Sequence, residues 1–275
     1  LPRRAVRRRA VRHSRAVNAS SRSVTLELLG TLIELRDLRS DTAELLAVLL
    51  RREARGEPCE IVDGSESEGD VLANLTRAVV TNSPLLCMHA GVVAAPAGLI
   101  AVPGASGLGK TTLTAALVRA GFGYVSDEVL AIDRSGLVVS PFARPLGLDR
   151  RSWQLLGLDG AAPGEREEAL VEPRRLGTLH DAPGAVRLIL LPERDGQPPR
   201  LDAARRGDAV TELLRRAFNH YTAPEQSFRA IVRLVRGAEV LRATYSDAPE
   251  LAALLAERFG VQSGLGADCN DGRSP

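Results

Sequence analysis

The stretch GASGLGKTT at residues 104–112 constrains the fold more than any other part of the chain. It fits the pattern G-x-x-x-x-G-K-[ST], a loop whose backbone N–H groups cradle the phosphates of a nucleotide at a helix N-terminus. Lys110 within it is the only lysine of the sequence, and the rest of the 36 Lys and Arg residues are arginines. Because a guanidinium is bulkier and forked, a lone lysine here indicates a site that needs a compact ammonium group.

The flanking sequence supplies the strand and the helix that give this motif its meaning. GLIAVPG (98–104) is an apolar run typical of a strand, and TTLTAALVRAG (111–121) has the periodicity of a helix that ends at Gly121. We therefore predict an α/β fold that binds ATP, with Mg²⁺ held by the Thr111 hydroxyl. The predicted nucleotide-binding residues are Gly104, Ala105, Ser106, Gly107, Leu108, Gly109, Lys110, Thr111 and Thr112.

Composition narrows the choice of partners. A net charge of +2 argues against nucleic acid as the partner of the whole molecule. Three widely spaced cysteines (Cys59, Cys87 and Cys269) suit neither a disulfide framework nor a C-x-x-C metal site, so we expect a cytoplasmic protein. No apolar run reaches the ~18 residues of a membrane span, which argues against a membrane partner. The sequence leaves the oligomeric state open, a homo-oligomer included.

The chain divides into four predicted sections. Residues 1–22 are rich in arginine and read as a disordered basic leader, and residues 263–275 read as a loose tail. Residues 23–83 form a small α+β section, with two strands around Gly30 and helices over 40–56 and 70–83, the first capped by Ser40 or Asp41. Residues 84–262 contain the phosphate-binding motif and form the main domain.

Two adjacent acids, Asp127 and Glu128, interrupt the apolar stretch FGYVSDEVLAID at residues 122–133. Successive strand residues point to opposite faces, so both acids can reach one site only if the strand ends or bends there. The carboxyl ends of strands border the ligand crevice in open α/β sheets. Acids at such a place can hold Mg²⁺ or accept the proton of an attacking hydroxyl. The alternative is a solvated turn.

Several nucleotide-binding classes lack their signatures here. The N-K-x-D motif of regulatory GTPases needs a second lysine, and neither L-S-G-G-Q nor the H-R-D and D-F-G pair occurs. Downstream, Arg144 is a candidate to neutralise a transferring phosphoryl group or to bind an acidic peptide end, with a solvated arginine as the alternative. The segment 162–184 is rich in charge, Pro and Gly, and is predicted to be a loop over the site or a subunit contact that includes His180. His220 is expected to cap or pack.

The order of these motifs resembles the catalytic domain of HPr serine kinase/phosphorylase. That family carries an M-H-A/G segment, a hairpin, G-x-S-G-x-G-K-[ST], a helix ending in R-A-G or R-R-G, and then [SA]-D-[DE]. The matching pieces here are His89, residues 104–112, residues 119–121 and residues 126–128. The similarity is good over residues 84–150 and weaker through 140–148 and 185–194. It is closest to the HPr-kinase-like proteins of gene clusters for ribosomally made peptides, lasso peptides in particular.

The resemblance implies roles for individual residues. Lys110 would hold the β- and γ-phosphates, while Asp127 and Glu128 would share metal binding and deprotonation of the acceptor. His89, which spacing alone would make a core residue, would lie beside them. The chain departs from HPr kinase in carrying Asp-Glu in place of Asp-Asp and in lacking the E-I-R-G-x-G segment.

Three functional hypotheses follow. The first is a Mg-ATP-dependent kinase with a P-loop core of HPr-kinase-like type, acting on a serine or C-terminal residue of a peptide or small protein. The second is a nucleotide-binding regulatory or scaffold protein without phosphoryl transfer. The third is a kinase for a small molecule.

Overall fold

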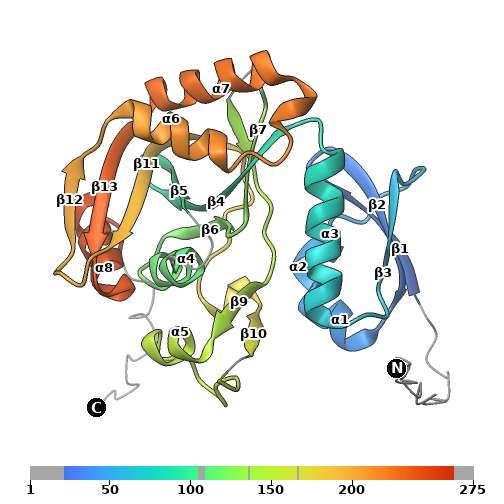
Figure 1. Ribbon diagram of the computed structural model, residues 1–275. Coiled ribbons are helices and arrows are strands. Elements are labelled where there is room, and N and C mark those ends of the chain that lie inside the picture. The colour runs from blue at the N-terminus through green and yellow to red at the C-terminus, as the bar shows by residue number, and fades with distance from the viewer. Residues whose placement is uncertain (1–21, 105–108, 136, 166, 263–275) are drawn as a thin grey trace, which may run out of the picture.

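The computed structural model describes residues 22–104, 109–135, 137–165 and 167–262, which form a mixed α/β protein (Figure 1). The predicted basic leader up to residue 21, the predicted tail at 263–275 and four of the predicted loop residues (Ala105, Ser106, Gly107 and Leu108) lie outside this part of the chain. Among the described residues, no helix has the length and apolar character that crossing a membrane requires.

The N-terminal section is a three-stranded sheet covered by helices. β1 runs antiparallel to β2 through a turn at Gly30, where φ is +76°, and β2 runs parallel to β3. The two strands predicted around Gly30 are therefore confirmed. The longest helix of the section packs its Leu75 and Val79 side onto the sheet. The elements are β1 (Arg22–Leu28), β2 (Thr31–Leu38), α1 (Ser40–Leu45), α2 (Ala47–Leu50), β3 (Glu60–Asp63) and α3 (Glu68–Asn82).

The single helix predicted over residues 40–56 differs from the structure in three respects: its division, its cap and its end. It is divided at Leu46 into α1 and α2, and its N-cap is Arg39, whereas the carboxylate of Asp41 accepts hydrogen bonds from Thr42 N–H and from the guanidinium of Arg39. The helix also ends early, because residues 52–54 turn back to pair with β1: Glu27 N–H donates to the carbonyl of Arg52 over 2.8 Å. This pairing covers a sheet edge that would otherwise be open.

The main domain is built on an eight-stranded sheet, counted within the described residues. β11 is its central strand and runs parallel to both β5 and β13, while the other neighbours pair antiparallel. The start of β11 also pairs with β8, so the sheet curls back on itself at that end. The strands are β4 (Leu86–Ala95), β5 (Gly98–Pro103), β6 (Gly123–Ser126), β7 (Val129–Ile132), β8 (Val138–Ser140), β11 (Gly184–Arg194), β12 (Arg200–Ala203) and β13 (Glu239–Tyr245).

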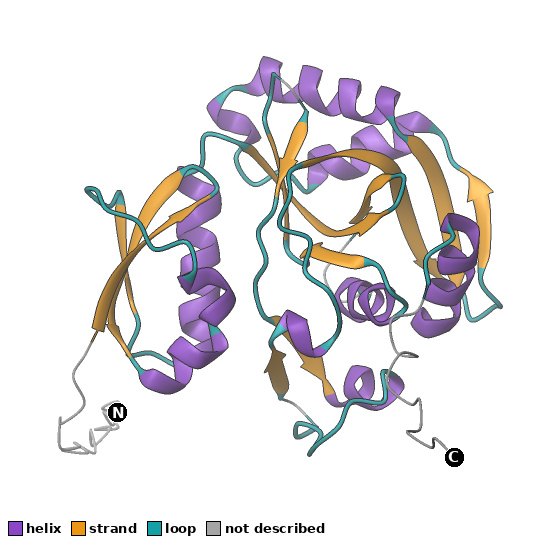
Figure 2. Ribbon diagram, turned by 180° about the vertical axis from the view of Figure 1, so that it is seen from behind, coloured by secondary structure: helices purple, strands orange, loops and turns teal. Residues whose placement is uncertain are grey.

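Helices cover both faces of this sheet (Figures 1 and 2). On one face α4 (Lys110–Arg119) and α8 (Ala248–Phe259) bury apolar side chains such as Leu117 and Leu255. On the other, α6 (Arg206–Arg215) and α7 (Pro224–Gly237) bury a second cluster that includes Leu213 and Ile231. The resulting helix–sheet–helix layering agrees with the predicted α/β class.

A small β-ribbon lies beside the N-terminal end of α4. β9 (Leu146–Asp149) pairs antiparallel with β10 (Glu168–Val171), and α5 (Arg150–Leu155) follows β9 directly. The loop predicted over 162–184 is therefore wrong for residues 168–171. Those residues are extended because their backbone groups bond to β9, a partner that local composition does not reveal.

Candidate functional site

The predicted phosphate loop joins the end of β5 to the start of α4, as its motif requires. Its last glycine, Gly109, is the N-cap of α4 and has φ +76°, a left-handed conformation that favours glycine. The first, Gly104, is buried, and a Cβ there would lie 3.3 Å from Cδ of Lys110. The aliphatic stem of the lysine therefore passes close over the backbone of Gly104.

Lys110 is held close to two carboxylates. Its side chain is buried, with 5% of the residue exposed. Burial lowers the pKa of its ammonium group, and the negative charges of Asp127 and Glu128 oppose that shift. The lysine is thus a cation placed at the helix N-terminus with little water around it, where its attraction for phosphate is stronger than at an exposed surface.

Asp127 and Glu128 lie at the bend that strand geometry requires if both are to reach one site. β6 ends at Ser126 and β7 begins at Val129, so Asp127 and Glu128 form the corner between two separate strands. The Ser126 hydroxyl fixes this corner by accepting the N–H of Val129 over 3.1 Å. One continuous strand would have sent the acids to opposite faces, whereas the corner lets both face the start of α4.

Asp127 is almost fully buried and contacts the first turn of α4. Burial raises its pKa above the ordinary value, against the lowering effects of Arg144 and of the neighbouring Thr111 side chain. Its Oδ1 atom is buried with no hydrogen-bond partner among the described residues. Buried carboxylate oxygens are normally bonded, so an open one marks a place for a proton or a cation.

Glu128 is held from two sides. Its Oε1 lies 3.1 Å from Nδ1 of His89, and its Oε2 lies 3.7 Å from Nη1 of Arg144. Burial, assisted by the charge of Lys110, lowers the pKa of His89 to about 4. The neutral imidazole is therefore favoured near pH 7, and its Nδ1 makes a close polar contact with Glu128 rather than a pair of full charges.

The structure brings together most of the predicted site residues that it describes. His89, on β4, is tied by its N–H to the carbonyl of Arg216, and its ring lies 5.9 Å from that of Phe218. Arg144 is positioned through its carbonyl, which accepts the hydroxyl of Tyr124 over 2.8 Å. Thr112 contributes differently, because its hydroxyl lies 2.7 Å from that of Ser152 and joins α4 to α5. His180 and His220 are not among the residues that line the space around the two acids.

No family model matches the chain, and no curated protein matches it either. The function is therefore inferred from the geometry of the site. Within the described residues, no group of three or more His, Cys, Asp or Glu side chains is arranged to hold a metal ion by itself. A metal at this site would need oxygen ligands from a bound nucleotide in addition to those of the protein.

Two adjoining cavities meet at the acid pair. The first, of about 380 Å³, is bordered by the N-terminal end of α4, by α5 and by His89. The second, of about 540 Å³, lies on the other side of the acids, and Asp127 lines this one. Thr111, Glu128, Gly147 and Glu168 line both. A group bound in one cavity would meet a group bound in the other at these shared residues.

Sequence reasoning missed four charged residues of the first cavity, Asp149, Arg151, Glu168 and Arg194. Arg194 ends strand β11, and its Nη1 lies 3.6 Å from where a Cβ on Gly109 would be. Glu168, on β10, lines the same cavity. Arg194 could have been found, since it lies two residues after the apolar run LILLP and strand ends border ligand crevices. Glu168 had no such signal.

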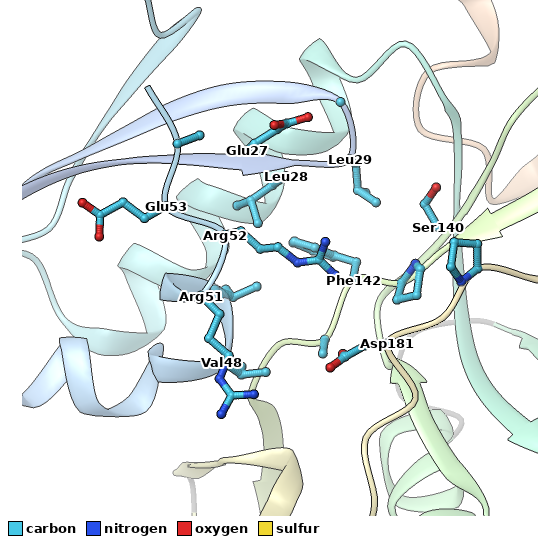
Figure 3. Close-up of a pocket in the computed structure, with 16 residues that line it drawn as sticks. Glu27, Leu28, Leu29, Val48, Arg51, Arg52, Glu53, Ser140, Phe142 and Asp181 are labelled. Atoms are coloured by element: carbon cyan, nitrogen blue, oxygen red, sulfur yellow. The ribbon is translucent and has the colours of Figure 1, made fainter. Parts of the chain in front are cut away.

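A third cavity, of about 580 Å³, lies away from the acids between the N-terminal section and the main domain (Figure 3). Arg52 reaches into it toward Phe142, and Asp181 borders it from the opposite side. None of the predicted site residues lines it.

Proposed function

We propose that this protein is a Mg-ATP-dependent kinase of HPr-kinase-like type that transfers the γ-phosphoryl group to a hydroxyl of a peptide or small protein. The acceptor would be a serine or a C-terminal residue, in the tailoring of a ribosomally made peptide. One observation carries the proposal: Asp127 and Glu128 line one cavity together with Thr111, which lies in the first turn of a helix that opens with G-K-T-T. This combines a phosphate-binding helix start with an acid within reach of the phosphates.

The first cavity has the features that a triphosphate needs. Backbone N–H groups at the N-terminus of α4 and the ammonium of Lys110 attract phosphate oxygens, and Arg194 adds a second cation. Thr111 and Glu128, which line both cavities, would hold Mg²⁺ at the boundary between them, and Asp127 lies next to Thr111. Mg²⁺ bound there would neutralise charge on the β- and γ-phosphates.

The second cavity supplies the acceptor side of the reaction. Asp127 lines only this cavity, so its open Oδ1 is the best placed atom to accept the proton of an acceptor hydroxyl. As that proton moves to Asp127, the hydroxyl oxygen forms its bond to the γ-phosphorus, and the bond to the β–γ bridging oxygen breaks and leaves ADP. Lys110 and Arg144 offset the charge that spreads over the transferring group. His89 holds Glu128 in place.

A transfer assay tests this proposal. The protein is incubated with Mg²⁺, γ-labelled ATP and a pool of synthetic peptides that each contain one serine, and both ADP and labelled peptide are measured. We expect label on peptide in proportion to the ADP formed. ATP binding without labelled peptide and without ADP would favour the regulatory or scaffold alternative. ADP formation that depends on an added small hydroxyl compound would favour a small-molecule kinase.

A further inference from the structure

The second cavity is a groove with one wall from each section of the protein. α3 of the N-terminal section provides one wall, and β9, β10 and Phe218 of the main domain provide the other. Its inner end is formed by Asp127, Glu128 and Thr111. The N-terminal section therefore borders the site, although its sequence carries no catalytic motif.

α3 has a second face that its own sheet does not use. The side chains directed at the three-stranded sheet are buried, and Leu75 is one of them. The groove is lined by α3 residues that recur every three or four positions and therefore share a different face of the helix. These are Gly69, Leu72, Ala73, Thr76, Arg77 and Val80. Ala73 and Arg77 on this face are exposed.

The dimensions and lining of the groove suit an extended peptide. Gly69 and Val80 are eleven residues apart on α3, which corresponds to roughly 16 Å of helix at about 1.5 Å per residue. An extended chain at ~3.3 Å per residue would place about five residues along that length. The walls combine polar side chains, such as Thr76, with apolar ones, Leu72 and Ala73 on one side and Leu170 and Phe218 on the other.

We infer that this groove binds the acceptor as an extended peptide segment, with α3 as one wall and apolar side chains of the peptide next to the residue that is phosphorylated. The inference rests on the proposed kinase function and adds to it the position of the acceptor. Arg77 sits on the groove wall but is paired with Glu60 over 2.9 Å, and Arg144 is engaged by Glu128. Because both arginines already contact carboxylates, we expect the apolar wall residues Leu72, Leu170 and Phe218 to contact the peptide side chains beside the acceptor.

A bulky side chain at Ala73 tests the groove directly. Ala73 is exposed, so Ala73→Trp adds volume to the groove without disturbing the buried side of α3. Thr81→Trp is the matched control, because Thr81 is exposed on the same helix but lines neither cavity. The measurements are kcat and KM for a pool of eleven-residue peptides with a fixed central serine, the Kd of Mg-ATP, and the melting temperature.

The expected result is a rise of at least tenfold in the peptide KM for Ala73→Trp, with an unchanged Kd for Mg-ATP, and wild-type behaviour for Thr81→Trp. Sequencing the labelled peptides should also show enrichment of apolar residues beside the serine, and Ala73→Glu should shift the selection toward basic residues. If the wild type labels no peptide, the kinase proposal fails. If the wild type labels peptides and Ala73→Trp does so with the same KM and selection, the groove assignment alone is overturned.

Discussion

Nδ1 of His89 lies 3.1 Å from Oε1 of Glu128, and the two residues come from different parts of the sheet, strand β4 and the corner after β6. Burial lowers the pKa of the imidazole to about 4, which favours its neutral form. A neutral imidazole adds no charge repulsion to Lys110. In the proposed kinase, His89 acts as a positioning residue that fixes the rotamer of Glu128.

Replacing His89 should therefore impair transfer more than nucleotide binding. We expect His89→Ala to lower kcat by about 10²-fold, the cost of a misplaced group. His89→Asn should recover part of the loss, since an amide N–H can replace Nδ1–H. His180→Ala is the control, because His180 lines neither cavity at the site. The pH profile of kcat should show no inflection near pH 6.5 that depends on His89. An inflection there that disappears in His89→Asn would contradict a neutral imidazole.

Lys110 should be indispensable for turnover and dispensable for folding. Lys110→Ala is expected to abolish ATP hydrolysis and transfer while leaving the thermal unfolding curve cooperative. Lys110→Arg should also fail, because the residue is 5% exposed and its stem already runs close to Gly104, which leaves no space for a guanidinium. Hydrolysis at the wild-type rate in either variant would refute the phosphate-binding role.

The roles of Asp127 and Glu128 should become distinguishable when each is replaced by its amide. Asp127→Asn should remove transfer by ~10²–10⁴-fold, the usual loss for a general base, and retain Mg-ATP binding. Glu128→Gln should instead raise the Mg²⁺ concentration needed for half-maximal activity, since this side chain borders both cavities. The opposite pattern would exchange the two roles. Wild-type rates in both variants would make the corner a solvated turn and favour the scaffold hypothesis.

The site could be predicted where its functional residues are adjacent in the sequence. The motif around Lys110 and the pair Asp127-Glu128 stand next to apolar runs, so their place at strand ends follows from the sequence. The contact of Arg144 with Glu128 was not predicted. An arginine in an arginine-rich chain carries little information, so the sequence left a phosphoryl or peptide contact and a solvated side chain as the two alternatives for Arg144. Arg194 and Glu168 enter the cavity through strand pairings that connect distant segments.

Two elements of the main domain, α7 and β13, were not predicted. α7 was missed although its buried residues, which include Ile231 and Leu234, recur at helical spacing. β13 was missed as well, and it is defined by parallel pairing with β11, 51 residues earlier (Leu188 with Glu239 in the register). Non-local pairing of this kind leaves no mark in the local pattern of either strand.

Stability should fall at alkaline pH through Cys87. This thiol is buried on β4, and burial raises its pKa from an ordinary value near 9 to about 11. A group whose pKa is raised by folding stabilises the protein fully below the unfolded-state pKa and loses that effect as pH rises, here between about 9 and 11. The loss is of the order of 2–3 kcal/mol. Urea unfolding at pH 8 to 11 measures it.

The control for that titration is Cys87→Ala, which should be less stable at pH 8 and show a flatter decline toward pH 11. Iodoacetamide gives a second measurement: in a Cys269→Ser background it should modify the exposed Cys59 at pH 8 and leave Cys87 unmodified until the protein unfolds. Rapid modification of Cys87 in the folded protein would contradict its burial.

The spacing between β4 and α4 should depend on the absence of a side chain at Gly91. A Cβ at Gly91 would lie 2.3 Å from Oγ1 of Thr114, far inside contact distance, whereas the Cβ of Thr114 is 3.6 Å away. Oγ1 of Thr114 is buried without a hydrogen-bond partner in the described part of the chain. Gly91→Ala should therefore cost about 1–3 kcal/mol of unfolding free energy. Thr114→Ala should cost about 1 kcal/mol, because it removes the buried Cγ2 methyl group, whereas the lost hydroxyl made no bond.

The double variant decides whether this contact is the cause. With Oγ1 absent, the methyl group of Ala at position 91 would meet only ordinary contacts, so most of the stability should return and the coupling energy should be about 1–2 kcal/mol. Because α4 begins with Lys110 and Thr111, Gly91→Ala should also raise the Kd of Mg-ATP, and the double variant should restore it. A double variant as unstable as Gly91→Ala would show that the strain arises elsewhere along β4.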